Sequence, residues 1–344
     1  MTSAHRLAVL AAVLTGASLM VAMSSVVRAR GYEPGDRVLL DAHNAYPERG
    51  RWADRIERAL ATGTPVAIEQ DLHWAKPPGA TSYTSVVAHD VEYVNDAPTL
   101  NTHFFERIRP IMEQALRENH RETWPLIVLN LDFKDNQSAH LDYIWSLLGQ
   151  YERWLTTATR SATPNRIEPF TVGPLLVLSG SDTAQRRRFH DDVAVGARLR
   201  TFGAVVPAPV AGRTTGQRAR RSIRMSAAQH LAQPADNFAR WANFPWRVVE
   251  QGGQHSAGDW TATDSVRLAS LVQRAHDQHL WIRFYTLDGF TPAQDRGFSA
   301  DYNFGTGAAV GARWQAAIAA GVDFVATDQY EEFSAMRSGW RRVR

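Results

Sequence analysis

Cysteine is absent from this chain of 344 residues, and lysine is almost absent. The lack of cysteine excludes disulfide bonds, thiolate metal sites, a cysteine nucleophile and a lipoprotein anchor. Only Lys76 and Lys134 are lysines among the 38 basic residues. The formal net charge is +3, so no global excess of basic residues favours nucleic-acid binding. Basic residues do cluster at 186–188 and 213–224, which is typical of solvated faces or, alternatively, of a patch that meets anionic lipid head groups.

Long hydrophobic runs are also scarce, and the one notable run lies at the N-terminus. His5 and Arg6 precede a mostly apolar stretch, 7–23, and Val27-Arg28-Ala29 resembles a cleavage site. This pattern predicts a secretory signal at 1–29, and hence a secreted, periplasmic or cell-envelope protein with a single domain at 30–344. The stretch is short for a membrane span of ~20 residues, but an uncleaved anchor is the alternative.

Past residue 30, strand-like and helix-like segments alternate, in a chain that is 44% hydrophobic and 21% charged. Strands are predicted at 38–43, 65–71, 126–133, 175–179, 281–287 and 322–327, with a short extended piece at 85–90. Helices are predicted at 52–62, 102–119, 138–157, 263–280 and 307–320. Residues 190–255 give only an extended piece at 201–206 and an irregular stretch at 238–247. The alternation favours a (β/α)8 TIM barrel. A doubly wound open sheet is the runner-up, but no glycine-rich dinucleotide loop follows the first strand.

Charged and polar residues end three of the predicted strands, where apolar residues are expected. They are His43, Asn44, Glu69, Asp71, Asp132 and Lys134. Strand side chains alternate between faces, so Glu69 and Asp71 share one face, as do Asp132 and Lys134. Burial of unpaired charge costs several kcal/mol, so such residues pair, bind a metal or take part in chemistry. The C-terminal rim of a barrel is also where its active sites form.

These residue types suit phosphoryl transfer with a metal ion. Three carboxylates and the Asn44 amide oxygen would form an all-oxygen site that suits Ca²⁺ or Mg²⁺ better than zinc. His43 and His89 are the natural acid–base pair, and Lys134 would supply positive charge for a developing anion.

Each of these motifs also has a structural interpretation when it is taken alone. Glu-x-Asp at a strand end is typical of a cap or an ion pair, and His-Asn is typical of a turn. Lys134 could pair with Asp132 or Asp135, and His89-Asp90 could be a loop pair. The combination, in this order and at strand ends, favours a catalytic site.

The order His-Asn, Glu-x-Asp, His-Asp and Asp-x-Lys resembles that of the phospholipase C-like phosphodiesterase superfamily. That superfamily includes glycerophosphodiester phosphodiesterases and calcium-dependent phosphoinositide phospholipases C, which are TIM barrels. Residues 281–289 and 320–329 resemble the last two strands of the glycerophosphodiesterases, whereas Asn44 matches the phospholipases C, in which this Asn ligates the metal.

The resemblance implies site roles. By this resemblance, His43 and His89 are catalytic and Lys134 contacts phosphate. One divalent cation, Ca²⁺ or Mg²⁺, has as its ligands Asn44, Glu69, Asp71 and Asp132. On the strand at 281–287, Arg283 and Tyr285 share a face and are predicted to bind a head group, by ion pairing and by stacking.

The predicted protein is therefore an exported, metal-dependent phosphodiesterase of lipid metabolism. Its substrate would be a phospholipid or a glycerophosphodiester, with peripheral membrane contact, and its reaction would pass through a cyclic phosphodiester. A glycoside hydrolase barrel that uses Glu69 with a second acid is one alternative, with carboxylates ~5–9.5 Å apart. The other is a non-catalytic lipid- or sugar-binding barrel.

Overall fold

The computed structural model describes residues 33–163, 165–250, 258–294 and 303–343. The predicted signal at 1–29 therefore lies outside the described residues. Among the helices that are described, none combines the length and the apolar character that a membrane span requires.

Eight parallel strands form a closed barrel, which confirms the predicted TIM-barrel fold. Around the barrel the order is β1, β2, β4, β7, β9, β10, β11 and β12, and β12 pairs again with β1. The bounds are β1 Leu39–Ala42, β2 Val66–Ala75, β4 Ile127–Phe133, β7 Leu175–Ser179, β9 Phe202–Ala204, β10 Ala239–Pro245, β11 Trp281–Tyr285 and β12 Phe324–Thr327.

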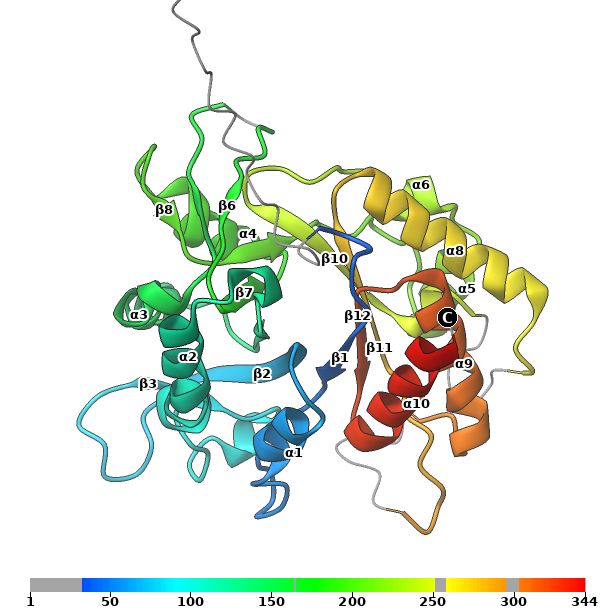
Figure 1. Cartoon of the computed structure of the whole chain (residues 1–344), viewed down its shortest axis with the longest axis horizontal. Coiled ribbons are helices and arrows are strands. Elements are labelled where there is room, and N and C mark those ends of the chain that lie inside the picture. Colours follow the sequence, from blue (N-terminus) through cyan, green and yellow to red (C-terminus); the bar gives the residue numbers. More distant parts are fainter. Residues whose placement is uncertain (1–32, 164, 251–257, 295–302, 344) are drawn as a thin grey trace, which may run out of the picture.

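Helices surround this barrel, with α2 and α3 on one side and α8, α9 and α10 on the other (Figure 1). Their bounds are α1 Arg55–Ala61, α2 Glu106–Glu118, α3 Ser138–Gln150, α4 Thr183–Arg186, α5 Thr215–Ser222, α6 Ala227–His230, α8 Ala262–Asp277, α9 Gly307–Ala320 and α10 Tyr330–Val343. Thr261 caps α8 in a capping box with Asp264. Gly321, at φ 78°, ends α9 in the left-handed conformation that glycine adopts without a steric penalty.

Two apolar cores follow from the alternation of the strands. Side chains such as Ile68, Leu129 and Ile282 face outward and pack against the helices. Their inward-facing neighbours, which include Ala67, Val128 and Trp281, fill the barrel itself with a second cluster. The same inward face carries the polar residues nearer the C-terminal ends of these strands, so the barrel is apolar at one end and charged at the other.

Two expectations about the elements need correction. The stretch predicted to be irregular, 238–247, contains β10. The helix predicted to reach residue 157 ends at Gln150, and residues Thr157–Thr159 instead form β5 of a small antiparallel sheet with β6, Phe170–Thr171, and β8, Arg198–Leu199.

The short extended piece at 85–90 overlaps β3, Thr84–Val87, which is not a barrel strand. It pairs antiparallel with the far end of β2, so the two form a hairpin that extends past the barrel. The chain then returns toward the rim, where the backbone amide of Ala88 donates to the carbonyl oxygen of Asp71 at 3.0 Å.

Candidate active site

The predicted site residues lie at the C-terminal rim because of the strand register. β2 and β4 run side by side with Glu69 opposite Asn130 and Asp71 opposite Asp132. Neighbouring residues on the same face of two paired strands lie close together, so the carboxylates of the two strands meet. One carboxylate oxygen each from Glu69, Asp71 and Asp132 lies within 4.8 Å of the other two. The structure thus brings together the three acidic residues that the sequence predicted as metal ligands.

Lys134 lies directly beside this acidic group. Its Nζ is 2.8 Å from Oδ2 of Asp71 and 2.8 Å from Oδ2 of Asp132. Burial alone would lower the pKa of Lys134, but the two carboxylates raise it above its ordinary value. The lysine therefore stays charged and holds the two acids together.

Asp71 is the most perturbed acid of the group. Burial, and then the nearby charges of Asp132 and Glu69, raise its pKa to about 8 even though Lys134 opposes the shift. The hydroxyl of Tyr46 lies 2.6 Å from Oδ2 of Asp71. Burial is therefore the main reason that the carboxyl group of Asp71 holds a proton more readily than a free aspartate does.

Asn44 connects the acidic group to the end of β1. Its φ of 53° is in the left-handed region, in which Asn is several-fold enriched among residues other than glycine. The amide oxygen of Asn44 lies 2.7 Å from the Tyr46 hydroxyl, and its backbone amide donates to Oε2 of Glu69 at 3.3 Å. The amide oxygen thus faces the same pocket as Asp71.

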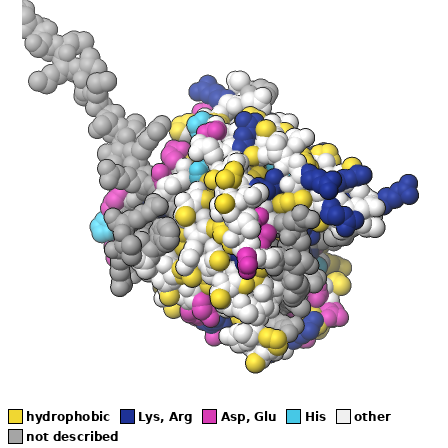
Figure 2. All heavy atoms as spheres, turned by 90° about the vertical axis from the view of Figure 1, so that its right-hand side faces the viewer, with side chains coloured by type: hydrophobic (Ala, Val, Ile, Leu, Met, Phe, Trp, Pro, Cys, Tyr) yellow, Lys and Arg dark blue, Asp and Glu magenta, His cyan; other side chains and the backbone are white. Residues whose placement is uncertain are grey.

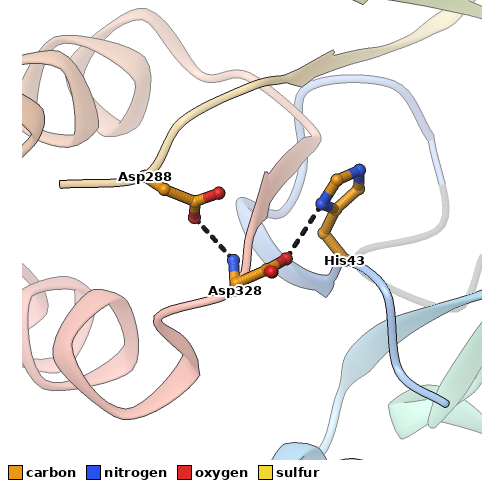
Figure 3. A group of neighbouring side chains, drawn as sticks. All are labelled: His43, Asp288 and Asp328. Atoms are coloured by element: carbon orange, nitrogen blue, oxygen red, sulfur yellow. Dashed lines mark hydrogen bonds and ion pairs between the residues drawn. The ribbon is translucent and has the colours of Figure 1, made fainter. Parts of the chain in front are cut away.

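His43 is held between two carboxylates, one on each ring nitrogen. Its Nδ1 lies 2.9 Å from Oδ1 of Asp328 (Figure 3), and its Nε2 lies 3.4 Å from Oε2 of Glu69. Burial would lower the pKa of His43, but Glu69 and Asp328 raise it to about 9. A buried imidazole in this setting carries a proton at neutral pH, with Nε2 directed at the acidic group.

Asp328 and Arg55 are site residues that the sequence analysis missed. Both guanidinium nitrogens Nη1 and Nη2 of Arg55, on α1, lie 3.3 Å from Oδ2 of Asp328. Burial would raise the pKa of Asp328, but Arg55 and His43 keep it below its ordinary value. The one sequence signal for Asp328 is its position directly after β12, and nothing in the sequence around Arg55 signals its role.

Asp288, which follows β11, supports Asp328 from the other side. Its Oδ1 accepts hydrogen bonds from the backbone amide of Asp328 at 2.7 Å and from the Thr327 hydroxyl at 2.6 Å (Figure 3 shows the first). Burial, and then the charge of Asp328, raise the pKa of Asp288 to about 7.

Arg283 lies beneath the rim, inside the barrel. Its side chain is 2% exposed, and its guanidinium pairs with Asp41, with Oε1 of Glu69 at 2.9 Å and with Oδ1 of Asn243 at 3.1 Å. Burial would raise the pKa of Glu69, but Arg283, His43 and Lys134 lower it. The observed role of Arg283 is therefore to hold Glu69 ionised and in place. A direct contact with a head group stays a prediction.

Two further predicted residues lie at the periphery of the group. The side chain of His89 is 39% exposed and forms an ion pair with Asp90 at 2.8 Å, and no contact joins it to His43 within the described residues. Tyr285 is partly buried, with its ring centre 5.4 Å from the guanidinium carbon of Arg283. A catalytic role for His89 and substrate binding by Tyr285 stay predictions.

Within the described residues, carboxylates and basic side chains form one connected network of ion pairs and hydrogen bonds around the acidic group. The acids are Asp41, Glu69, Asp71, Asp132, Asp288 and Asp328, and the cations are His43, Arg55, Lys134 and Arg283. The donors of the acidic group are all oxygens, which fits Ca²⁺ or Mg²⁺.

No family model matches the chain, and no curated protein matches it. Comparison with solved structures finds similar folds. A glycerophosphoryl diester phosphodiesterase from Parabacteroides distasonis shares 13% identity at a TM-score of 0.42, with 89% of this chain and 88% of that chain covered. A calcium-dependent phosphoinositol-specific phospholipase C from Pseudomonas sp. shares 12% identity at a TM-score of 0.46, with 88% and 92% covered.

A structure of Plasmodium falciparum HPPK-DHPS also matches, with 8% identity, a TM-score of 0.44 and 49% of that chain covered. At such identities a shared barrel does not fix an activity, so the function has to be argued from the side chains at the rim.

Proposed function

We propose that this protein is a metal-dependent phosphodiesterase that cleaves the phosphodiester of a phospholipid or a glycerophosphodiester. The observation that carries the proposal is the acidic group of Glu69, Asp71 and Asp132, which has Lys134 on one side and the His43–Asp328 pair on the other. Few other reactions need an oxygen-ligand cation site, a fixed ammonium and an oriented imidazole in one buried rim.

Glu69, Asp71, Asp132 and the amide oxygen of Asn44 would hold the cation. Ca²⁺ or Mg²⁺ bound there would neutralise a phosphate oxygen and stabilise the charge that develops on it. The other residues act through their own atoms. Lys134 places its ammonium where a second phosphate oxygen can reach it, and Asp328 fixes Nδ1 of His43, so that Nε2 is the atom that exchanges a proton with the substrate.

The proposed reaction has two in-line steps. In the first, a substrate hydroxyl next to the ester attacks phosphorus, a new P–O bond forms and the bond to the leaving alkoxide breaks. His89 takes the proton of the attacking hydroxyl, and His43, which already carries a proton, protonates the leaving oxygen. Water then opens the cyclic phosphodiester, with the same groups in reversed roles.

The experiment that tests this function is a panel of phosphodiesters. Glycerophosphocholine, phosphatidylinositol, sphingomyelin and an aryl phosphodiester are incubated with the enzyme, with EDTA, and with Ca²⁺ or Mg²⁺ restored. We expect hydrolysis of at least one natural diester, loss with EDTA and recovery with one of the metals. A lack of hydrolysis for all members under every metal would refute the proposal. Absence of a cyclic product in early ³¹P NMR spectra would refute the two-step route alone.

Export is part of the proposal and has its own test. The apolar stretch at 7–23 and the small residues before Arg30 support a cleaved signal. Cell fractionation followed by N-terminal sequencing should give a mature protein outside the cytoplasm that begins at Arg30. A full-length protein in the cytoplasmic fraction would contradict export and leave the enzymatic proposal intact.

A further inference from the structure

The segment around α5 is strongly basic and contains no acid. Between Asp192 and Asp236 the chain has no Asp or Glu, and five arginines lie at 213–224. The segment packs against the 3₁₀ turn Trp246–Val248, which adds the exposed Arg247. Such a density of one charge is unusual in a chain with a formal net charge of +3.

Most of these arginines are exposed and lack a neutralising partner. Arg213, Arg220, Arg221 and Arg224 are exposed and form no ion pair with any residue that the structure describes. By contrast, Arg186, Arg187 and Arg188, in the other basic cluster, pair with Asp236, Asp192 and Asp142. Basic side chains gather and project on the side of the molecule that carries α5, α8 and α9 (Figure 2).

The basic segment lies at the catalytic end of the barrel. It follows the C-terminal end of β9, and its neighbour, the turn Trp246–Val248, follows the C-terminal end of β10. The backbone amide of Trp246 donates to the hydroxyl of Thr286 at 3.3 Å, and Thr286 lies between Tyr285 and Asp288 on the rim. A surface that met α5 would therefore also lie near the mouth of the site.

Exposed apolar side chains lie at this end too. Val206, which follows β9, is 63% exposed, and Val91, which follows His89, is 72% exposed. Tyr83 is 54% exposed on the β2–β3 hairpin, which extends past the rim. Single exposed apolar residues are common. Three of them in separate loops at one end of a barrel could insert together into the interface of a lipid bilayer.

We infer that the catalytic end of the barrel docks on an anionic lipid bilayer, with the arginines of 213–224 on the head groups and Tyr83, Val91 and Val206 at the interface. The charge of the segment is complementary to anionic lipid, and the apolar loop residues favour a bilayer over a nucleic acid, which offers no apolar phase. The docking itself does not depend on the proposed function. Where the two are combined, they identify the substrate as a lipid in a membrane and not as a soluble head group.

The test measures vesicle binding apart from turnover. The mature protein in EDTA is sedimented with phosphatidylcholine vesicles that contain none or about a third phosphatidylserine. The variant R220Q/R221Q/R224Q is compared with the control R117Q/R153Q/R198Q, which removes equal charge from exposed arginines outside the rim loops. Each head-group arginine contributes roughly a fivefold effect, so the first variant should bind about 100-fold more weakly and the control should bind like wild type.

The outcomes separate docking from catalysis. Equal binding of wild type and R220Q/R221Q/R224Q, or no preference for phosphatidylserine, would overturn the inference. Tighter binding of duplex DNA than of vesicles at the same salt concentration would overturn it in favour of a nucleic-acid surface. With a soluble diester, R220Q/R221Q/R224Q should keep its rate within about twofold. If vesicles bind as expected but no diester is hydrolysed, docking stands and the proposed function fails.

Discussion

Replacement of Asp328 by Asn should damage both the stability and the activity of the protein, for two separate reasons. Asp328 is the partner of Nδ1 of His43 at 2.9 Å and of both terminal nitrogens of Arg55 at 3.3 Å. The substitution keeps the shape of the side chain and removes its charge. It therefore leaves the buried guanidinium of Arg55 without its counter-ion and His43 without the group that fixes its orientation.

The stability loss follows from the burial of Arg55. Removal of one partner of a buried ion pair costs about 3–5 kcal/mol. For a chain of this length, an unfolding entropy of ~0.7 kcal/mol/K converts that loss to a fall in Tm of about 4–7 °C. In the activity assay, kcat should fall by about 10²–10⁴, because a histidine that is no longer oriented is a poor acid–base group.

The matched control is Asp288→Asn. Asp288 contacts the backbone of Asp328 and the Thr327 hydroxyl, but not His43, and both of those hydrogen bonds can go to an amide oxygen. Because burial has already raised the pKa of Asp288 to about 7, loss of its charge should cost little stability. If D328N keeps more than half of the wild-type kcat, or if D288N loses as much as D328N, the orientation of His43 by Asp328 is refuted.

Three further predictions concern the proposed metal ligand Asp71, the buried cation Arg283 and the buried imidazole of His103, whose Nε2 lies 3.1 Å from the carbonyl oxygen of Ala45. A metal at 100 times its Kd should raise the Tm of the wild type by about 4 °C. Asp71→Asn should abolish this rise and change the metal-free Tm little. An undiminished rise would exclude Asp71 as a ligand. Arg283→Met should lower the free energy of unfolding in urea by about 3–5 kcal/mol, because Asp41 and Glu69 lose their shared cation, whereas the exposed R187M should match wild type. Burial lowers the pKa of His103 to about 4, so the unfolded state takes up a proton first as pH falls below 6.5. The free energy of unfolding should therefore fall by up to about 3 kcal/mol between pH 6.5 and 4. Urea titrations at each pH should show a weaker dependence of this free energy on pH for H103Q than for wild type.

The sequence predicted the elements whose local pattern agrees with their place in the barrel. β4 has a near-continuous apolar stretch, as expected for a strand buried on both faces, and it was predicted within one residue at its start. β10 was missed because Arg240, Asn243 and Pro245 interrupt any apolar pattern. Arg240 is nevertheless buried, since its guanidinium donates to the carbonyl oxygen of Glu168 at 2.8 Å and lies 4.8 Å from the ring centre of Phe170.

The sequence could predict only those site residues that lie at the C-terminal ends of recognisable strands. Glu69, Asp71, Asp132 and Lys134 come from adjacent strands, and a parallel sheet necessarily brings such ends together. The partnership of His43 with Asp328 needs the closure of β12 on β1 across 285 residues of sequence, which no local pattern encodes. The burial of Arg283 was likewise invisible, because the sequence shows which face of β11 it occupies but not its depth in the barrel.

We propose that the acidic group of Glu69, Asp71 and Asp132 serves phosphodiester cleavage through a bound divalent cation. The most direct measurement is a ³¹P NMR time course on a phosphodiester mixture, with wild type and D71N, each in EDTA and in Ca²⁺ or Mg²⁺. We expect a growing product signal only for wild type with metal, and a residual rate at least about 10²-fold lower in the other samples. Hydrolysis that continues in EDTA, or that survives D71N, would contradict this proposal.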